Sequence, residues 1–406
     1  MAIYNAFSDK TIFLGKHAFQ NLSISEMTPS LYDVMIREHF IVHDECDETK
    51  EYIHGVIAEE QTNNQVHLLI NPTIDCNFRC WYCYESHKKT QMSEDIMLRI
   101  KRLISDSFSK GKEIQISWFG GEPMIFFREV IIPILEFTKI EACKRHRKFY
   151  TNMTSNGFLF SVNRIKELLK YNFNGVQITL DGNKEQHNRV RYSKNGKGSF
   201  DTIIENVKKL ALNSVPITLR INCTETNVGG LSDVAYLFDD LPEEFKQYIN
   251  VDLQIVWQEK NVEYIKSHLG NIVECFSKVG ITAAKMSYRD FCYGDKRNSC
   301  VVNYNGDIYK CTAVDFETTE RDGYLDQQGN IVWENGKLEK RMASRFTNPP
   351  CHSCRILPLC HGGCTRHTLN NAPGYCLYGF DENAKDRVVL DRIEYNITHG
   401  AKNKTL

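Results

Sequence analysis

Three closely spaced cysteines give the clearest chemical signal in the chain. Cys76, Cys80 and Cys83 form a C-x3-C-x2-C group directly after an apolar, strand-like run. Thiolates are ligands for soft metals, and three of them with a water could hold zinc. Three thiolates could also hold a [4Fe-4S] cluster, in which case one iron is left open to an outside ligand. The spacing therefore indicates a metal site with a vacant position.

A second group of cysteines lies near the carboxyl end. Its core has the spacing C-x2-C-x5-C-x3-C, a further cysteine follows, and three more come earlier in the chain. In chain order these eight residues are Cys292, Cys300, Cys311, Cys351, Cys354, Cys360, Cys364 and Cys376. Residues 286–380 are rich in Cys, Gly, Asn and Pro and offer little hydrophobic core, so we expect metal to stabilise them. Two zinc sites are one interpretation of this pattern.

An Asn-Gly pair predicts a hairpin between two of these cysteines. Asn305-Gly306 is flanked by residues 301–304 and 307–310, and a two-residue turn would pair residue 304 with residue 307. This register puts Cys300 directly opposite Cys311, roughly 5 Å apart at Cβ. Ligands of one cluster need that proximity. A disulfide would need it too, but a reducing compartment disfavours one. The other four cysteines, which stand singly, are expected to be small buried hydrophobic residues. They are Cys46, Cys143, Cys223 and Cys275.

The elements that position these cysteines alternate between strand and helix patterns. Six apolar strand-like runs are predicted at residues 67–73, 113–119, 148–154, 174–180, 216–222 and 251–257. Amphipathic helices lie between them, for example after the Ser93 cap. Such βα units form a parallel sheet, either an incomplete barrel or an open doubly wound sheet. The fold class is therefore α/β, and the first cysteine group falls at the carboxyl end of the first strand.

The chain divides into four predicted parts. Residues 1–66 form an N-terminal extension, which is a cap or a docking structure for a partner. Residues 67–285 form the βα domain, residues 286–380 the cysteine-rich domain, and residues 381–406 a helix and tail. The 406 residues carry 50 Lys and Arg against 51 Asp and Glu, a balance that gives no field for nucleic acid or anionic lipid. Without an export signal or a membrane span, a cytoplasmic protein is expected.

The first cysteine group carries a family resemblance. The segment DCNFRCWYCYE resembles the cluster loop of the radical S-adenosylmethionine (SAM) superfamily, in which an aromatic residue precedes the third cysteine as Tyr82 does here. The resemblance implies an incomplete (β/α)6 barrel and a [4Fe-4S] cluster on Cys76, Cys80 and Cys83. The open iron would bind SAM, and the reduced cluster would cleave it to a 5'-deoxyadenosyl radical.

Further segments match the positions at which relatives bind SAM. Gly120-Gly121-Glu122-Pro123 resembles the family's GGEP segment, in which glycines permit close approach and the glutamate meets the SAM amino group. Ser155-Asn156 comes after the third predicted strand, and the segment Thr179-Leu180-Asp181-Gly182 comes at the end of the fourth. Arg191 is similar to an arginine that could pair with the SAM carboxylate. Ordinary turn chemistry explains the same polar residues without a ligand. No catalytic side chain is assigned.

The second cysteine group resembles the SPASM domain, which carries two auxiliary [4Fe-4S] clusters. By analogy, one cluster takes the ligand set Cys292, Cys300, Cys311 and Cys364. The other takes Cys351, Cys354, Cys360 and Cys376. The implied cofactors are thus three [4Fe-4S] clusters and SAM. Full ligation of the auxiliary clusters favours electron transfer or electrostatic tuning over direct binding of substrate.

Enzymes with both domains mostly modify peptides or proteins. The leading hypothesis is a peptide maturase that abstracts hydrogen from a ribosomally made precursor and forms a thioether or carbon-carbon bond. Its partners would be the precursor peptide or protein and an electron donor such as flavodoxin or ferredoxin. One alternative is sulfatase maturation, the oxidation of Cys or Ser to formylglycine. That subgroup places an Asp after the cysteine that closes the hairpin, whereas Thr312 follows Cys311 here and Asp315 lies nearby. The other alternative is a non-catalytic metal-binding module.

Overall fold

The computed structural model describes residues 2–16, 19, 27–83, 85–256, 258–284, 291–371 and 374–400. The chain forms two compact units. The first combines Met1–Asn63, Arg289–Arg297 and Leu338–Leu406, and the second combines Asn64–Tyr288 and Asn298–Lys337. The predicted division into four parts stays a prediction, and its boundary at residue 286 lies outside the described residues.

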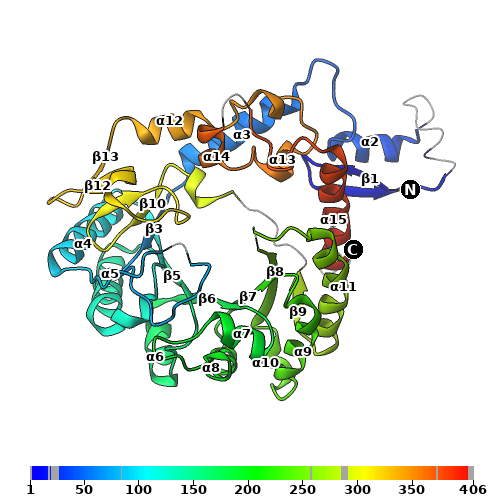
Figure 1. Ribbon diagram of the computed structural model, residues 1–406. Helices are drawn as coiled ribbons and strands as arrows, with labels where there is room; N and C mark the ends of the chain where they lie inside the picture. Colours follow the sequence, from blue (N-terminus) through cyan, green and yellow to red (C-terminus); the bar gives the residue numbers. More distant parts are fainter. Residues whose placement is uncertain are drawn as a thin grey trace. The chain divides into compact units, whose positions relative to one another are not determined.

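The second unit is built on an eleven-stranded sheet. Figure 1 shows that the sheet is curved and that the helices lie on its outer side. Its strand order is β13-β12-β11-β10-β3-β4-β5-β6-β7-β8-β9. The six predicted strands are confirmed, apart from Trp257, which lies outside the described residues. They are β3 (Gln65–Ile70), β4 (Glu113–Trp118), β5 (Phe149–Ser155), β6 (Phe173–Leu180), β7 (Ile217–Cys223) and β8 (Ile249–Ile255). A short strand, β9 (Thr282–Ala284), follows β8.

The order of these strands decides between the two predicted architectures. From β3 to β8 each strand pairs in parallel with the next in the chain, for example His67 with Gln115 and Ile217 with Ile249. A doubly wound sheet reverses its order at a switch point, whereas a βα barrel runs in sequence. The described strands leave β9 and β13 as separate edges of the sheet. The prediction of an α/β fold of the incomplete-barrel type is confirmed.

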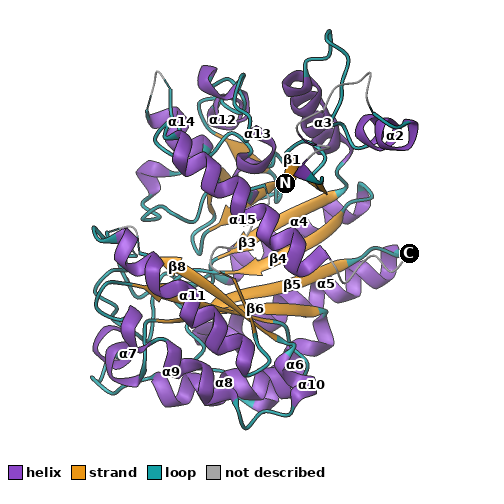
Figure 2. Ribbon diagram, turned by 90° about the vertical axis from the view of Figure 1, so that its right-hand side faces the viewer, coloured by secondary structure: helices purple, strands orange, loops and turns teal. Residues whose placement is uncertain are grey.

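Helices cover the outer face of this sheet (Figure 2). They are α4 (Glu94–Ser109), α5 (Ile132–Arg145), α6 (Val162–Leu168), α7 (Lys184–Val190), α8 (Phe200–Leu212), α9 (Ser232–Ala235), α10 (Glu243–Lys246) and α11 (Val262–Lys278). The predicted cap is present, because the Ser93 hydroxyl accepts from the Ile96 amide at 3.3 Å. On α4, Ile96, Ile100 and Ile104 share one buried face. Burial of such faces against Ile114, Ile116 and their neighbours forms the core.

A meander of four strands joins the other end of the sheet. The strands are β10 (Ser299–Val302), β11 (Asp307–Tyr309), β12 (Gly323–Leu325) and β13 (Ile331–Trp333). β10 lies parallel to β3, with Cys300 opposite Leu68 and Val302 opposite Ile70. The hairpin therefore extends the sheet of the βα units. The sequence does not predict this pairing of β10 with β3.

The predicted register of the β10–β11 hairpin is wrong by one residue. Val301 pairs with Tyr309 and Val302 with Ile308, so the ladder continues toward Cys300 opposite Lys310 rather than opposite Cys311. The loop contains three residues instead of two: the Gly306 amide donates to the Asn303 carbonyl at 2.9 Å, and Gly306 has φ +86°. A type I turn followed by a left-handed glycine produces this geometry.

The first unit is mostly helical. It contains the hairpin β1 (Ala2–Asn5) and β2 (Lys10–Phe13) and the helices α2 (Pro29–Arg37), α3 (Glu48–Thr62), α13 (Leu357–Cys360), α14 (Thr365–Asn370) and α15 (Glu382–Gly400), with α12 (Lys337–Ala343) at its border. On α3, the Tyr52 hydroxyl lies 2.6 Å from His361 Nδ1. Arg345 pairs with Glu60 at 2.6 Å. The N-terminal extension therefore shares one packed unit with part of the cysteine-rich segment, residues 289–297 and 338–380.

None of the helices in the described part of the chain has the length and apolar character that crossing a membrane requires.

The hairpin turn generates a stability prediction. Replacing Gly306 by Ala places a side chain at φ +86° and a Cβ 2.9 Å from Ile96 Cδ1. We expect the G306A protein to lose about 1 to 2 kcal/mol of unfolding free energy, because a left-handed backbone is costly for alanine. The shift in the urea midpoint, followed by circular dichroism under anaerobic conditions, measures this loss.

Gly270→Ala is the matched control, since Gly270 sits within α11 and its added Cβ meets nothing within 4 Å. This variant should be neutral or slightly more stable, because alanine favours a helix. Equal midpoints for G306A and the unaltered protein would show that the turn is not formed as described.

Candidate functional site

The three-cysteine loop follows β3 and is held in place on both sides. The Asp75 carboxylate accepts from the Cys76 amide at 2.8 Å, and Lys194 pairs with Asp75 at 2.9 Å. Phe78 forms a bridge with Ser193, and the Lys194 amide donates to the Asn77 carbonyl at 3.0 Å. Backbone hydrogen bonds therefore connect the segment after α7 to the cysteine loop.

The three sulfurs lie where water reaches them poorly. Cys76 is buried, and its Sγ accepts from the Phe78 amide at 3.4 Å and lies 3.7 Å from Asn156 Nδ2. Burial raises the pKa of Cys76 to about 12, with the nearby Glu122 charge adding to the effect. Burial likewise raises the pKa of Cys83 to about 11, and it raises the pKa of Cys80. Such thiols ionise readily only beside a metal cation, so they suit metal ligands better than free nucleophiles.

The two glycines after β4 serve the protein's own packing. A Cβ on Gly120 would lie 2.3 Å from the Thr73 carbonyl, and one on Gly121 would lie 2.2 Å from the Asp75 carbonyl. The Gly121 amide donates to Thr73 and the Glu122 amide to Asp75. The end of β4 thus forms the floor of the cysteine loop. Close approach of a ligand to these glycines stays a prediction.

Glu122 is fully buried and ties three segments together. Its carboxylate accepts from the Met124 amide at 3.0 Å, from the Ser155 hydroxyl at 2.9 Å and from the Asn156 amide at 2.8 Å. Burial raises its pKa, although these hydrogen bonds oppose the shift. Pro123 starts the short turn η2 (Pro123–Phe126). The structure therefore brings Glu122, Ser155 and Asn156 together, and the protein's own amides and hydroxyl already occupy much of the Glu122 carboxylate. Contact of these three residues with SAM stays a prediction.

Tyr82 and Arg191 meet at Asp181, directly after β6. The Tyr82 hydroxyl donates to Asp181 Oδ2 at 2.6 Å, and Arg191 Nη1 lies 3.0 Å from the Tyr82 oxygen and 3.4 Å from Asp181. Asn222, at the end of β7, donates to the other Asp181 oxygen at 2.9 Å. Thr179 lies on β6 in register with Arg220. This network links the cysteine loop to two strands and to the segment after α7.

Two buried polar atoms here lack a hydrogen-bond partner. Arg191 Nε is one, although the guanidinium is 8% exposed and also lies 5.8 Å from the centre of the Phe78 ring. An orphaned buried donor is costly, and an anionic ligand such as a carboxylate would satisfy it. The other is Glu85 Oε2, two residues after Cys83; burial raises the pKa of Glu85 to about 8. The donor set around the three thiols therefore fits a metal cluster with an anionic, polar ligand beside it.

Sequence reasoning missed two of these residues as site residues: Asn222 and Glu85. Asp181 lies in the segment Thr179-Leu180-Asp181-Gly182, which resembles a SAM-contacting segment of relatives, although Asp-Gly also marks an ordinary turn. Asn222 ends a predicted strand at the same edge as Thr179. Glu85 carries no pattern that separates it from a surface carboxylate.

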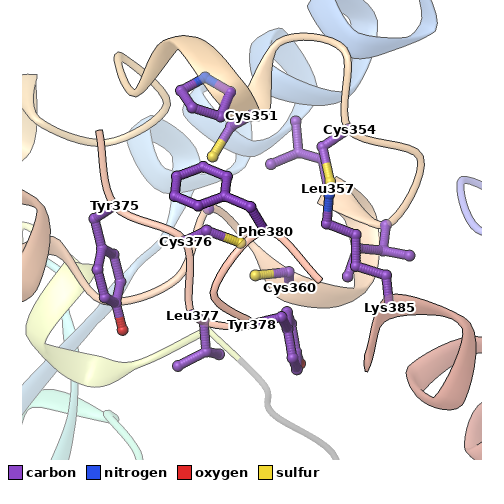
Figure 3. A pocket seen from close by; sticks show the side chains of 13 residues that line it. Cys351, Cys354, Leu357, Cys360, Tyr375, Cys376, Leu377, Tyr378, Phe380 and Lys385 are labelled. Carbon is purple, nitrogen blue, oxygen red and sulfur yellow. The ribbon is translucent and has the colours of Figure 1, made fainter. Parts of the chain in front are cut away.

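The second cysteine group also contains a defined hollow. Figure 3 shows Cys351, Cys354, Cys360 and Cys376 around a pocket of the first unit, with about 390 Å³ of atom-free space that includes open solvent. Asn348 clamps its wall: its side chain accepts from the Tyr375 amide at 3.1 Å and donates to Cys351 Sγ at 3.3 Å. Burial, together with the charges of the three neighbouring thiols, raises the pKa of Cys360 to about 11. The four predicted ligands of one cluster therefore converge on one space.

The other four predicted ligands fall in both units. Cys292 and Cys364 belong to the first unit, and Cys300 and Cys311 belong to the second. Cys300 is fully buried, and burial raises its pKa to about 12 while Lys310 opposes the shift. The assignment of these four to one cluster stays a prediction. In the described residues no three His, Cys, Asp or Glu side chains form a ready site for a single metal ion.

All fifteen cysteines are free thiols. Of the four that stand singly, Cys223 and Cys275 are buried as predicted. The prediction is wrong for Cys143, which is exposed on α5, and for Cys46, which is half-buried. Neither lies on a strand, where the alternation of faces makes burial easiest to predict.

Comparison with known proteins agrees with this geometry. Residues 70–227 match the family model of the Radical SAM superfamily. The cysteine-type anaerobic sulfatase-maturating enzyme of Clostridium novyi (strain NT) is 25% identical over 343 residues, which are 75% of this chain and 89% of that protein.

Two solved structures share the fold. Native anSMEcpe with bound AdoMet and Cp18Cys peptide has a TM-score of 0.60 at 20% identity, covering 82% of this chain and 97% of that one. Streptococcus suis SuiB bound to precursor peptide SuiA has a TM-score of 0.54 at 14% identity, covering 92% and 94%. The prediction of an enzyme is confirmed rather than that of a non-catalytic metal module. Residues 70–227, which include the three-cysteine loop, thus form a radical SAM domain, and the cofactors that this superfamily implies are a [4Fe-4S] cluster and S-adenosylmethionine.

Proposed function

We propose that this enzyme is a maturase that abstracts hydrogen from a residue of a ribosomally made precursor peptide and forms a thioether or carbon-carbon cross-link. When bound, the reduced cluster and SAM supply a 5'-deoxyadenosyl radical. The observation that carries the proposal is the pocket of Cys351, Cys354, Cys360 and Cys376 in a chain that also has a radical SAM domain. This pairing is typical of enzymes that modify peptides or proteins.

The chain's own residues would perform distinct tasks in this site. Cys76, Cys80 and Cys83 would hold the cluster, and Arg191 would offer its unsatisfied Nε to the SAM carboxylate. Asp181 would orient Arg191 and Tyr82, while Glu122 keeps β4 and β5 in place behind the loop. The burial of these groups excludes water, which would otherwise quench or screen the chemistry. The auxiliary clusters, on the two predicted ligand sets, would accept the surplus electron. An electron donor such as flavodoxin or ferredoxin would reduce the SAM-binding cluster.

The N-terminal extension supports a peptide substrate. The likeness to SuiB covers 92% of this chain. The uncovered part is shorter than the extension of residues 1–66, so the likeness must include part of that extension. The SuiB structure holds its precursor peptide SuiA. The likeness to anSMEcpe covers 82%, and that structure also holds a peptide. We infer that part of residues 1–66 binds the precursor.

Sulfatase maturation is the second candidate. It is supported by the 25% identity to the Clostridium novyi enzyme along most of both chains. Against it, Thr312 rather than an Asp follows Cys311, and the nearby Asp315 is exposed, with its carboxylate accepting from the Glu317 amide at 3.2 Å. A carboxylate engaged in a surface turn is a poor general base for a buried substrate.

Mass spectrometry separates the two candidates. The enzyme, reconstituted anaerobically, is incubated with SAM, a reductant and short peptides encoded beside its gene. We expect a peptide to lose two hydrogens per event, because a cross-link replaces two bonds to hydrogen. A parallel reaction uses a peptide with a sulfatase active-site cysteine. Formylglycine there, with the precursor peptides unchanged, would contradict the peptide-maturase proposal.

Removal of the three loop cysteines tests the site of SAM cleavage. The Cys76→Ala, Cys80→Ala, Cys83→Ala triple variant should release no 5'-deoxyadenosine, measured by liquid chromatography, because no iron is left open to SAM. Its iron content should fall by about a third from the roughly twelve atoms of three cubanes. Cys143→Ala, which removes an exposed lone thiol, is the control and should keep both iron and cleavage. Continued 5'-deoxyadenosine release by the triple variant would refute the site.

Replacing Arg191 by Lys tests its contact with SAM. Lysine keeps the charge but lacks the planar fork, so it cannot engage Asp181 and a carboxylate together. We expect SAM binding to weaken at least tenfold in isothermal titration calorimetry, equivalent to about 1.4 kcal/mol. Iron content and the circular dichroism spectrum should stay unchanged. An unaltered dissociation constant in a folded, cluster-loaded variant would assign Arg191 a purely structural role.

A further inference from the structure

A lysine faces the pocket of the four cysteines. Lys385, on α15, lines the pocket together with Cys351, Cys354, Cys360 and Cys376. Its side chain is 12% exposed, and Figure 3 shows it extending in the direction of Cys354. Lys385 interacts electrostatically with Cys354 and Cys376. A shielded ammonium beside thiolates is a strong local charge, because little water screens it. The pocket thus contains a fixed positive charge beside its sulfurs.

Neighbouring charges hold this lysine in place. Glu382, one turn earlier on α15, accepts from Lys385 Nζ at 2.5 Å and from Arg355 Nη2 at 3.0 Å. Arg355 directly follows Cys354 and also pairs with Asp386 at 2.8 Å. The Glu382 side chain is 62% exposed, so water screens its negative charge far more than the positive charge of Lys385. Among the described residues that line the pocket, Lys385 is the only one with a basic side chain, and none is acidic apart from the thiols.

We infer that Lys385 raises the reduction potential of the iron-sulfur cluster held by Cys351, Cys354, Cys360 and Cys376, and so makes that cluster a better electron acceptor. This inference rests on the proposed function, because it requires a cluster in the pocket. A [4Fe-4S] cluster with four thiolates is a dianion when oxidised and becomes a trianion when it takes up one electron. A nearby cation stabilises the trianion more, and net charge and hydrogen bonds are known to set such potentials.

The direction of this effect matches the task of the cluster. The deoxyadenosyl radical takes one hydrogen atom from the substrate; bond closure then breaks a second bond to hydrogen, releasing its proton to solvent and one electron to the cluster. An acceptor with a raised potential takes that electron more readily than one surrounded by negative groups. Lys385 would then tune the cluster and take no part in bond making or breaking.

The test is a redox titration followed by electron paramagnetic resonance, with dithionite and mediators as the electron source. It is performed on anaerobically reconstituted protein that carries the Cys76→Ala, Cys80→Ala, Cys83→Ala substitutions, so the SAM-binding cluster does not contribute. The signal that disappears on Cys360→Ala identifies the cluster in the pocket. In Lys385→Met we expect its ratio of reduced to oxidised forms, at a fixed potential, to fall about tenfold, equivalent to 59 mV for one electron.

Two variants serve as controls. Lys385→Arg keeps the charge and should keep the midpoint close to its original value. Lys50→Met removes a lysine of the same unit that also pairs with an acid three residues earlier, Asp47 at 3.2 Å, but whose side chain is 75% exposed. It should leave the midpoint unchanged. Lys385→Gln repeats the comparison should the methionine variant lose iron, and loss of iron in both would overturn the electrostatic role in favour of a structural one.

The outcomes separate the inference from the proposed function. If Cys360→Ala loses no iron, the pocket holds no cluster and the proposed auxiliary assignment fails. If Cys360→Ala loses about four irons while Lys385→Met keeps its iron and its midpoint, the assignment stands and only the role of Lys385 is refuted. A midpoint that shifts to more negative values in Lys385→Met alone supports both.

Discussion

Both cysteine sites depend on the burial of thiols such as Cys76 and Cys360, because little water is available there to solvate a thiolate. At Cys76 and at Cys360 burial is the main cause of a raised thiol pKa, and neighbouring negative groups add to it. A thiolate in such a place needs a positive partner, so metal binding and the final packing of the loops are coupled. The same burial protects the chemistry, because a site that disfavours a bare thiolate also keeps out solvent.

Two buried carboxylates, Glu122 and Asp181, act as joints, which here means that they connect neighbouring segments by hydrogen bonds. Glu122 connects β4 to β5 through the Ser155 hydroxyl and the Asn156 amide, and Asp181 connects the cysteine loop to β6 and β7. Each carboxylate is buried and accepts several hydrogen bonds, which offsets part of the cost of removing it from water. These joints lie at the carboxyl ends of neighbouring parallel strands. The βα fold thus supplies a common edge, and the carboxylates fix the geometry along it.

The sequence predicts this scaffold well where neighbouring residues in the chain determine the structure. The six strands follow from short apolar runs between amphipathic helices, and their bounds agree within two or three residues where they are described. The three-cysteine loop falls at the expected strand end. Prediction fails where distant segments decide the outcome. Asn305-Gly306 fits a two-residue or a three-residue turn equally, and only pairing with the rest of the sheet selects the second. Gly120 and Gly121 pack against the backbone of residues 73–75, which no spacing in the sequence reveals.

The parallel pairing of β10 with β3 makes the first βα strand an interior strand. The Asn71 amide donates to the Val302 carbonyl and the His67 amide to the Asn298 carbonyl, so β3 has hydrogen-bonded neighbours on both sides. A shortened chain ending before residue 298 would bare one whole side of an apolar strand, which invites sheet-to-sheet aggregation. The strands β10 to β13 are therefore part of the βα sheet, although they come from the cysteine-rich part of the sequence.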